Sequence, residues 1–175
     1  MTGVPIPPGS VVVIDTSVII AIGRPANEKY RALEQYVTRH DITVRVPDYV
    51  ASELGESPDA YQYQHESLRA ARDAGWVHPV SAKFDAPAVS TVIDRTRERM
   101  AALSADDVTE DEIEKTDAVL AGVAYQLAQN DQSIGVLVSD SIAEQAIADV
   151  LSAEGCEVSV VEGREFVTSL VESEL

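Results

Sequence analysis

The sequence predicts an α/β protein: a three-layer α/β/α sandwich with a central, mainly parallel sheet of four to five strands. Short runs of β-branched residues alternate along the chain with longer segments of helical periodicity, which is typical of parallel sheets covered by helices. The first run, Val11 to Ile14, is apolar at every position, as in a central strand buried on both faces. An aspartate closely follows two of these runs, and parallel sheets bind ligands at that end of their strands.

The first half of the chain is expected to contain three strands and four helices. Residues 10–14 form the first strand, and TSVIIAIG forms a short buried helix that ends at Gly23. An amphipathic helix follows at 26–40, because its large apolar residues share one side. The other elements of this half are a strand at 42–47, a helix at 48–56 between an Asp48 cap and a Gly55 stop, a polar helix at 58–74 and a strand at 75–80.

The second half continues the same alternation. Two helices are expected at about 86–103 and 110–129, and the second begins with TEDE, in which Thr109 and Glu112 can form a capping box. The remaining elements are a strand at 133–140, a helix at 141–155 that ends at Gly155, a strand at 156–161 and a terminal helix at 163–172. No internal repeat interrupts this order.

The charge balance is strongly acidic. Thirty Asp and Glu residues face 13 Lys and Arg, for a formal net charge of −17, and only three of the basic residues are Lys. Acidic excess with scarce lysine resembles the composition of proteins from salt-loving archaea. Such a surface stays hydrated in concentrated salt, where the Debye length falls to about 3 Å at 1 M and self-repulsion largely disappears.

One domain is expected over residues 10–175, after a flexible lead-in over residues 1–9. The length suffices for a single sizeable core, and the core should be aliphatic because aromatic residues make up only 5% of the chain. Cys156 is the only cysteine, so no intramolecular disulfide is possible, and the cytoplasm is the default compartment. No apolar run approaches the roughly 18 residues of a membrane span.

Asp15 and Asp140 are candidate site residues because each follows an apolar strand. The carboxyl ends of parallel strands meet at one edge of a sheet, so the two carboxylates point to one cleft. For each residue alone, capping of the next helix is the competing interpretation.

Asp117 and Glu53 are candidates because of their helical neighbours. Asp117 lies in line with the apolar stripe of its helix, where an ionised carboxylate is costly unless it is paired, hydrogen-bonded or metal-bound. A salt bridge at the edge of the core is the alternative. Glu53 lies one turn after Val50, beside the inward side of its helix, and could equally be a surface residue. Glu56 and Glu114 compete with Glu53 and Asp117 for these roles.

Four segments together resemble the PIN-domain nucleases. They are VIDTSVII, VASEL, KTDAVLAGVAYQLA and VLVSDS, in this order, and the resemblance covers the chain from about Val11 to Val167. It implies a parallel α/β/α sandwich whose acidic residues meet at the carboxyl ends of the central strands. Matched motif by motif, those residues are Asp15, Glu53, Asp117 and Asp140. The accompanying hydroxyls match Ser17 or Thr16 near the first aspartate, and Ser139 and Ser141 near the last.

Such a cluster predicts a divalent metal. Four carboxylates cannot all stay ionised without a counter-charge, and Mg²⁺ or Mn²⁺ prefers hard oxygen ligands. The three histidines are scattered and no CxxC occurs, so the sequence does not predict a zinc site. Asp15, Asp117 and Asp140 would hold the metal, with Glu53 as a further ligand or the orienter of the attacking water. The resemblance implies RNA hydrolysis that leaves a 5′-phosphate and a 3′-hydroxyl.

RNA binding by so acidic a chain requires local cations. Two clusters are candidates for contact with an RNA backbone: Arg24, Lys29 and Arg31 after the first motif, and Arg95 with Arg99 one helical turn apart. Their alternative role is a solvated helix face with ion pairs.

Two other functions compete with a metal-dependent ribonuclease. An aspartate-nucleophile phosphotransferase would use Asp15, but that class usually needs a second aspartate where this chain has Ser17. A catalytically silent PIN-like scaffold would bind RNA or a protein. Among nucleases, the size resembles the toxins of toxin–antitoxin pairs, which form homodimers and are blocked by an antitoxin; stand-alone RNA-processing members are the alternative.

The charge predicts that stability rises with salt. We expect the thermal unfolding midpoint to increase between 0.1 M and 3 M KCl, because screening removes the repulsion among the 30 acidic residues. Circular dichroism melts over this range test the expectation. A midpoint that is independent of KCl, or that falls, would contradict it.

Overall fold

The computed structural model describes most of the chain. The described residues are 6–47, 69–80, 82–104, 115–130, 132–139 and 141–173. Within these ranges, the side chains of residues 16, 17, 20, 115, 116, 117 and 173 are not described. The expected helix at 48–56 and the capping box at Thr109 and Glu112 lie outside the described residues.

The centre of the molecule is a five-stranded, all-parallel sheet, as the sequence predicts. Its spatial order is β3-β2-β1-β4-β5, with β1 in the middle. Parallel ladders join each neighbouring pair, and Ile14 lies opposite Leu137 at the end of the β1–β4 ladder. The strands are β1 (Val11–Ile14), β2 (Thr43–Pro47), β3 (Val77–Val80), β4 (Ile134–Val138) and β5 (Val158–Glu162).

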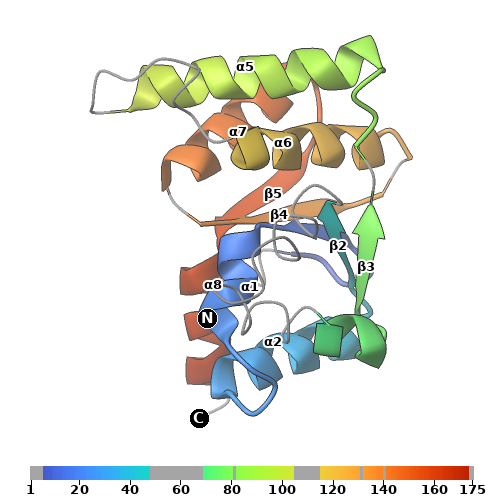
Figure 1. Cartoon of the computed structure of the whole chain (residues 1–175), viewed down its shortest axis with the longest axis vertical. Helices are drawn as coiled ribbons and strands as arrows, with labels where there is room; N and C mark the ends of the chain where they lie inside the picture. Colours follow the sequence, from blue (N-terminus) through green and yellow to red (C-terminus); the bar gives the residue numbers. More distant parts are fainter. Residues whose placement is uncertain are drawn as a thin grey trace.

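Helices cover both faces of this sheet (Figure 1). On one face lie α1 (Thr16–Ile22), α2 (Glu28–Arg39) and α8 (Gly163–Ser173); on the other lie α6 (Lys115–Ala128) and α7 (Ser141–Ala153). The sixth labelled helix, α5 (Pro87–Leu103), packs on α6 and α7 and forms the outermost layer of that side. The three-layer prediction is therefore confirmed, with α5 added outside it.

Two hydrophobic clusters fill the space between sheet and helices, and the first also contains the buried rings of Tyr30, Tyr36, Trp76 and Phe166. One joins alternate residues of β1, such as Val12 and Ile14, to α1, α2 and α8. The other joins Val11 and Val13 to α5, α6 and α7. Because side chains alternate between the two faces of a strand, the unbroken apolar run of β1 serves both clusters.

The folded part of the chain begins earlier than expected. Ile6 belongs to the segment that we expected to be a flexible lead-in, yet its side chain is only 1% exposed and is part of the core. The buried hydroxyl of Tyr36 donates a hydrogen bond of 3.1 Å to the carbonyl of Ile6. Residues from Ile6 onward are thus fixed against α2 rather than free.

A close approach of α5 to α6 depends on Gly122. A Cβ atom at this position would lie 2.6 Å from Cγ1 and 2.9 Å from Cδ1 of Ile93, a buried residue of α5. Alanine is the smallest residue with a Cβ, so every other side chain also requires the two helices to separate. Gly122 therefore sets the distance between the outer helix and the inner layer.

We predict that Gly122→Ala lowers the free energy of unfolding by about 1–2 kcal/mol, because the clash with Ile93 outweighs the gain in helix propensity. Chemical denaturation in molar KCl measures the change. In an Ile93→Ala background the clash is absent, so the same substitution should be neutral or stabilising. An equal loss in both backgrounds would show that packing against Ile93 is not the cause.

Candidate functional site

The sheet has a topological switch point between β1 and β4. The chain moves from β1 to β2 and β3 on one side, then crosses to β4 and β5 on the other. The connecting helices accordingly lie on opposite faces of the sheet. Loops that leave β1 and β4 diverge to these faces, and ligands of open α/β sheets bind in the crevice between them.

Asp15 lies directly at this switch point. It follows the last residue of β1, and its backbone N–H donates a 2.9 Å hydrogen bond to the carbonyl of Leu137 in β4. Its carbonyl accepts a 3.0 Å bond from the N–H of Val18 in α1. The residue is only 4% exposed, which makes it one of three buried polar residues among those the structure describes.

Helix α6 brings Asp117 to the same edge of the sheet. The helix has 14 residues, about 21 Å at 1.5 Å per residue, and a short connection leads from its C-terminus to the start of β4. It therefore runs antiparallel to β4, with Asp117 in its first turn at the carboxyl edge. Contacts with β1 and β4 place it over the switch point. The Asp117 side chain is not described.

Two of the four predicted carboxylates lie outside the described residues. These are Glu53 and Asp140; Glu56 and Glu114 also lie outside. Ser139 and Ser141, which flank Asp140, are described: Ser139 is half-buried after β4, and Ser141 is exposed at the start of α7. Thr16 and Ser17 are the first residues of α1, and their side chains are not described.

The first basic cluster lies on the turn between α1 and α2. Arg24, Lys29 and Arg31 are all exposed, and α2 runs back from this turn toward the start of β2, so the turn is at the carboxyl end of the sheet. The guanidinium of Arg31 donates a 2.8 Å hydrogen bond to the carbonyl of Ala26. The cluster therefore shares the Asp15 end of the molecule.

The second basic cluster, Arg95 and Arg99 of α5, forms ion pairs with acidic residues at the end of α7. Arg95 pairs with Glu154 at 3.0 Å, and Arg99 pairs with Asp149 at 2.9 Å. Both acidic partners lie in or just beyond the last part of α7, whereas Ser141 and the carboxyl edge are at its start. The structure thus places Arg95 and Arg99 in ion pairs between α5 and α7, and does not bring them together with Asp15.

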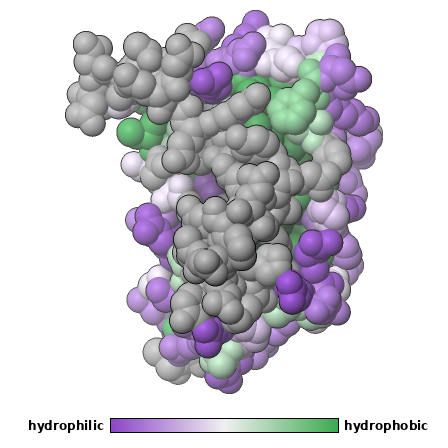
Figure 2. Space-filling model, in the orientation of Figure 1, coloured by the Kyte–Doolittle hydropathy of each residue, from purple (hydrophilic) through white to green (hydrophobic). Residues whose placement is uncertain are grey.

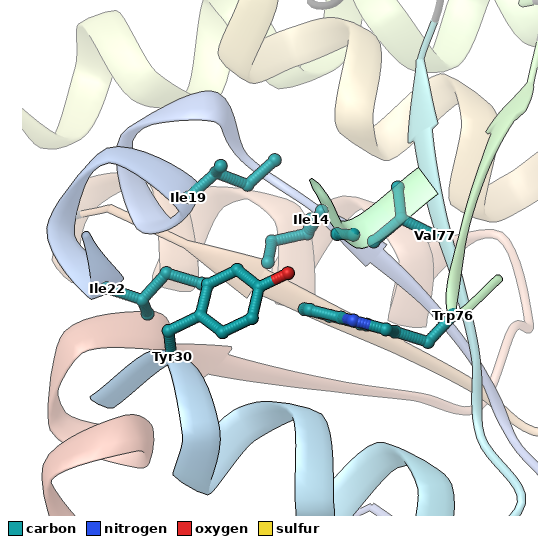
Figure 3. A pocket seen from close by; sticks show the side chains of 7 residues that line it. Ile14, Ile19, Ile22, Tyr30, Trp76 and Val77 are labelled. Carbon is teal, nitrogen blue, oxygen red and sulfur yellow. The ribbon is translucent and has the colours of Figure 1, made fainter. Parts of the chain in front are cut away.

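A small apolar cavity of about 10 Å³ lies between helices α1 and α2 and the side of the sheet that holds β1 and β3. Figure 3 shows Ile14 pointing into it, together with Ile19 and Ile22 of α1, Tyr30 and Trp76. The Tyr30 and Trp76 rings meet edge to face, with centroids 5.6 Å apart. Burial raises the pKa of the Tyr30 phenol, and the charge of Glu34 raises it further, so the phenol is neutral at physiological pH. The side chains that line this cavity therefore pack against one another and carry no charge.

The face shown in Figure 2 is mostly hydrophilic outside the grey residues. A hydrophobic area appears near the start of α5, next to which Phe84 is 45% exposed. Among the described residues, no helix is both long and apolar enough to cross a membrane.

Sequence reasoning missed two charged residues at the carboxyl edge, Glu162 and Arg164. Glu162 is the last residue of β5, and its carboxylate accepts hydrogen bonds from the N–H groups of Arg164 and Glu165, at 3.3 and 2.8 Å. The guanidinium of Arg164 donates a 3.0 Å bond to the carbonyl of Ser139, across from β5 to the end of β4. The signal that identified Asp15, a charged residue at the end of an apolar strand, would also have found Glu162.

A comparison with models of known protein families identifies the family of this chain. A family model described as the halobacterial PIN domain matches residues 8–174. The chain belongs to this PIN-domain family. PIN domains are generally nucleases, and such nucleases usually use divalent metals. Searches of curated proteins and of solved structures found no match to this PIN domain.

The Asp15 carboxylate is the kind of ligand that suits a hard divalent cation. Asp15 offers a buried carboxylate at the switch point, and Mg²⁺ and Mn²⁺ prefer carboxylate oxygens. Within the described ranges no three His, Cys, Asp or Glu side chains gather into a metal site. Of the four predicted carboxylates, only that of Asp15 belongs to a described side chain.

Gly163 holds α8 against the segment that carries Asp15. A Cβ atom at Gly163 would lie within 2.8 Å of Cγ1 of Val18, a fully buried residue whose N–H binds the Asp15 carbonyl. Only a residue without a side chain lets α8 begin so close to α1.

We predict that Gly163→Ala destabilises this PIN domain by about 1–3 kcal/mol, because α1 and α8 must separate. Urea unfolding in molar KCl gives the value. Val18→Ala leaves a cavity that the new methyl group fills, so the double variant should be more stable than the sum of the single effects. Strict additivity would contradict the packing argument.

Proposed function

We propose that this protein is a divalent-metal-dependent endoribonuclease. The observation that carries the proposal is the buried Asp15 carboxylate at the β1–β4 switch point of a chain that belongs to a PIN-domain family. Open α/β sheets bind ligands at such a switch point, which supports a substrate site there. Membership of a PIN-domain family supports nuclease chemistry. Asp117 is the second residue supported by position, because the start of α6 reaches the same edge.

The residues would divide the work as follows. Asp15, Asp117 and Asp140 hold the metal, and Glu53 orients the water or serves as a further ligand. When bound, Mg²⁺ or Mn²⁺ supplies the charge that lowers the pKa of a coordinated water and offsets charge on the scissile phosphate. The backbone hydrogen bond from Asp15 to Leu137 of β4 fixes the point from which the Asp15 side chain extends. The exposed cations Arg24, Lys29 and Arg31 would contact the RNA backbone beside the crevice.

A toxin role follows from the resemblance and stays a prediction. It would make the protein one half of a toxin–antitoxin pair in the cytoplasm, as a homodimer blocked by an antitoxin protein. A stand-alone RNA-processing role uses the same site.

The decisive experiment is cleavage of end-labelled structured RNA in molar KCl with Mn²⁺. We expect metal-dependent cutting that EDTA abolishes and that Asp15→Asn and Asp117→Asn each reduce about 100-fold or more, since even outer-shell changes at metal sites cost 10–100-fold. Asp94→Asn is the matched control, because Asp94 is exposed on the outer helix α5.

Equal cutting by wild type, both site variants and the control would indicate a contaminant or a different site. Absence of cutting by a folded wild type that binds Mn²⁺ would favour the silent scaffold. A covalent phosphate on Asp15 would instead identify the phosphotransferase.

A further inference from the structure

Residues Glu162 to Arg164, at the junction of β5 and α8, contact helix α1, which follows Asp15, and the end of strand β4. Gly163 packs on Val18, three residues after Asp15. Arg164 binds the carbonyl of Ser139, which immediately precedes Asp140. These two contacts connect a segment outside the four sequence motifs to the segments that carry the first and last of the carboxylates.

The guanidinium of Arg164 is held in one orientation. Its Nη2 donates to the Ser139 carbonyl at 3.0 Å, and its Nε lies 3.5 Å from Oε1 of Glu162. Glu162 is itself fixed, because its carboxylate caps the first turn of α8 and its side chain is only 13% exposed. One hydrogen bond and one ion pair together restrict the rotation of this planar guanidinium.

The carbonyl group that accepts this hydrogen bond, that of Ser139, lies just beyond the end of β4. The β4–β5 ladder ends with Val138 opposite Glu162, so ladder hydrogen bonding stops just before Ser139. The carbonyl of Ser139 is therefore held by a side chain at the point where regular pairing ends. Ligands at metal sites need this kind of support, because outer-shell partners set the orientation of ligand-bearing segments.

We propose that Arg164 is a positioning residue for the metal site: by holding the Ser139 carbonyl, it fixes the direction in which the chain enters Asp140. The inference rests on the proposed function, in which Asp140 is a metal ligand. Arg164 acts through the backbone and not on the reacting atoms. Glu162 contributes by orienting the guanidinium.

Affinity for Mn²⁺ alone, measured in the full chain by isothermal titration calorimetry in molar KCl, tests this role without RNA. We expect Arg164→Gln to weaken Mn²⁺ binding about tenfold, the lower end of the range for outer-shell changes. Glu162→Gln keeps an oxygen acceptor for the α8 amides and should weaken binding less. Arg164→Lys should restore part of the loss, because an ammonium can still donate to Ser139.

Arg72→Gln is the matched charge control. Arg72 is exposed on the helical turns before β3, at the amino end of the sheet, and should leave Mn²⁺ affinity within twofold of wild type. Circular dichroism melts of the metal-free variants confirm folding; Arg164 is 63% exposed, so its substitution should hardly change the midpoint.

Unchanged Mn²⁺ affinity in Arg164→Gln would overturn the proposal, including the case in which KM for RNA rises and Arg164 proves to be a substrate contact. An equal loss in Arg72→Gln would also overturn it, because the effect would then be general electrostatics. Failure of the proposed function is separable: wild type would bind Mn²⁺ without cutting RNA, and the Arg164 comparison would still be measurable.

Discussion

The central position of β1, paired with β2 on one side and β4 on the other, determines the rest of this architecture. Both neighbours are parallel to it, so every connection must cross a face of the sheet, and the crossing face changes between β1 and β4. The four residues of β1 are each at most 6% exposed because helices cover both sides. A polar residue can follow such a strand only where the covering layers separate, and Asp15 occupies that place.

The helical layers around the site depend on close packing rather than on charge. Gly122 and Gly163 each permit a helix to approach a branched side chain, Ile93 in α5 and Val18 in α1. The second of these contacts lies next to Asp15, and Arg164 supports the exit of β4 from the same junction. Rigid neighbours are what an acidic metal site requires, because ligand geometry must persist before the cation arrives.

Much of the fold followed from periodicity, since the apolar strands and the amphipathic α2 carry strong local patterns. Asp15 was found because a carboxylate after an apolar strand is conspicuous. The role of Arg164 was not predictable from its neighbours in sequence, because its partner, Ser139, is 25 residues away and is brought near only by the β4–β5 pairing. Burial of Ile6 likewise depends on a distant partner, Tyr36. The ion pairs of Arg95 and Arg99 arise between helices rather than within one.

A net charge of −17 would repel RNA in dilute solution, so the RNA binding that we propose would have to take place in concentrated salt. With a Debye length of about 3 Å at 1 M, long-range repulsion and counterion release both become small. Binding then depends on contacts at hydrogen-bond distance, so the placement of each cation matters more than their number. Arg31 is held by a backbone carbonyl and Arg164 by a carbonyl together with the Glu162 carboxylate, whereas Arg95 and Arg99 are held by carboxylates. A guanidinium bound to a carbonyl keeps its full positive charge, so Arg31 retains it at the carboxyl end of the sheet, while the charges of Arg164, Arg95 and Arg99 are offset by carboxylates.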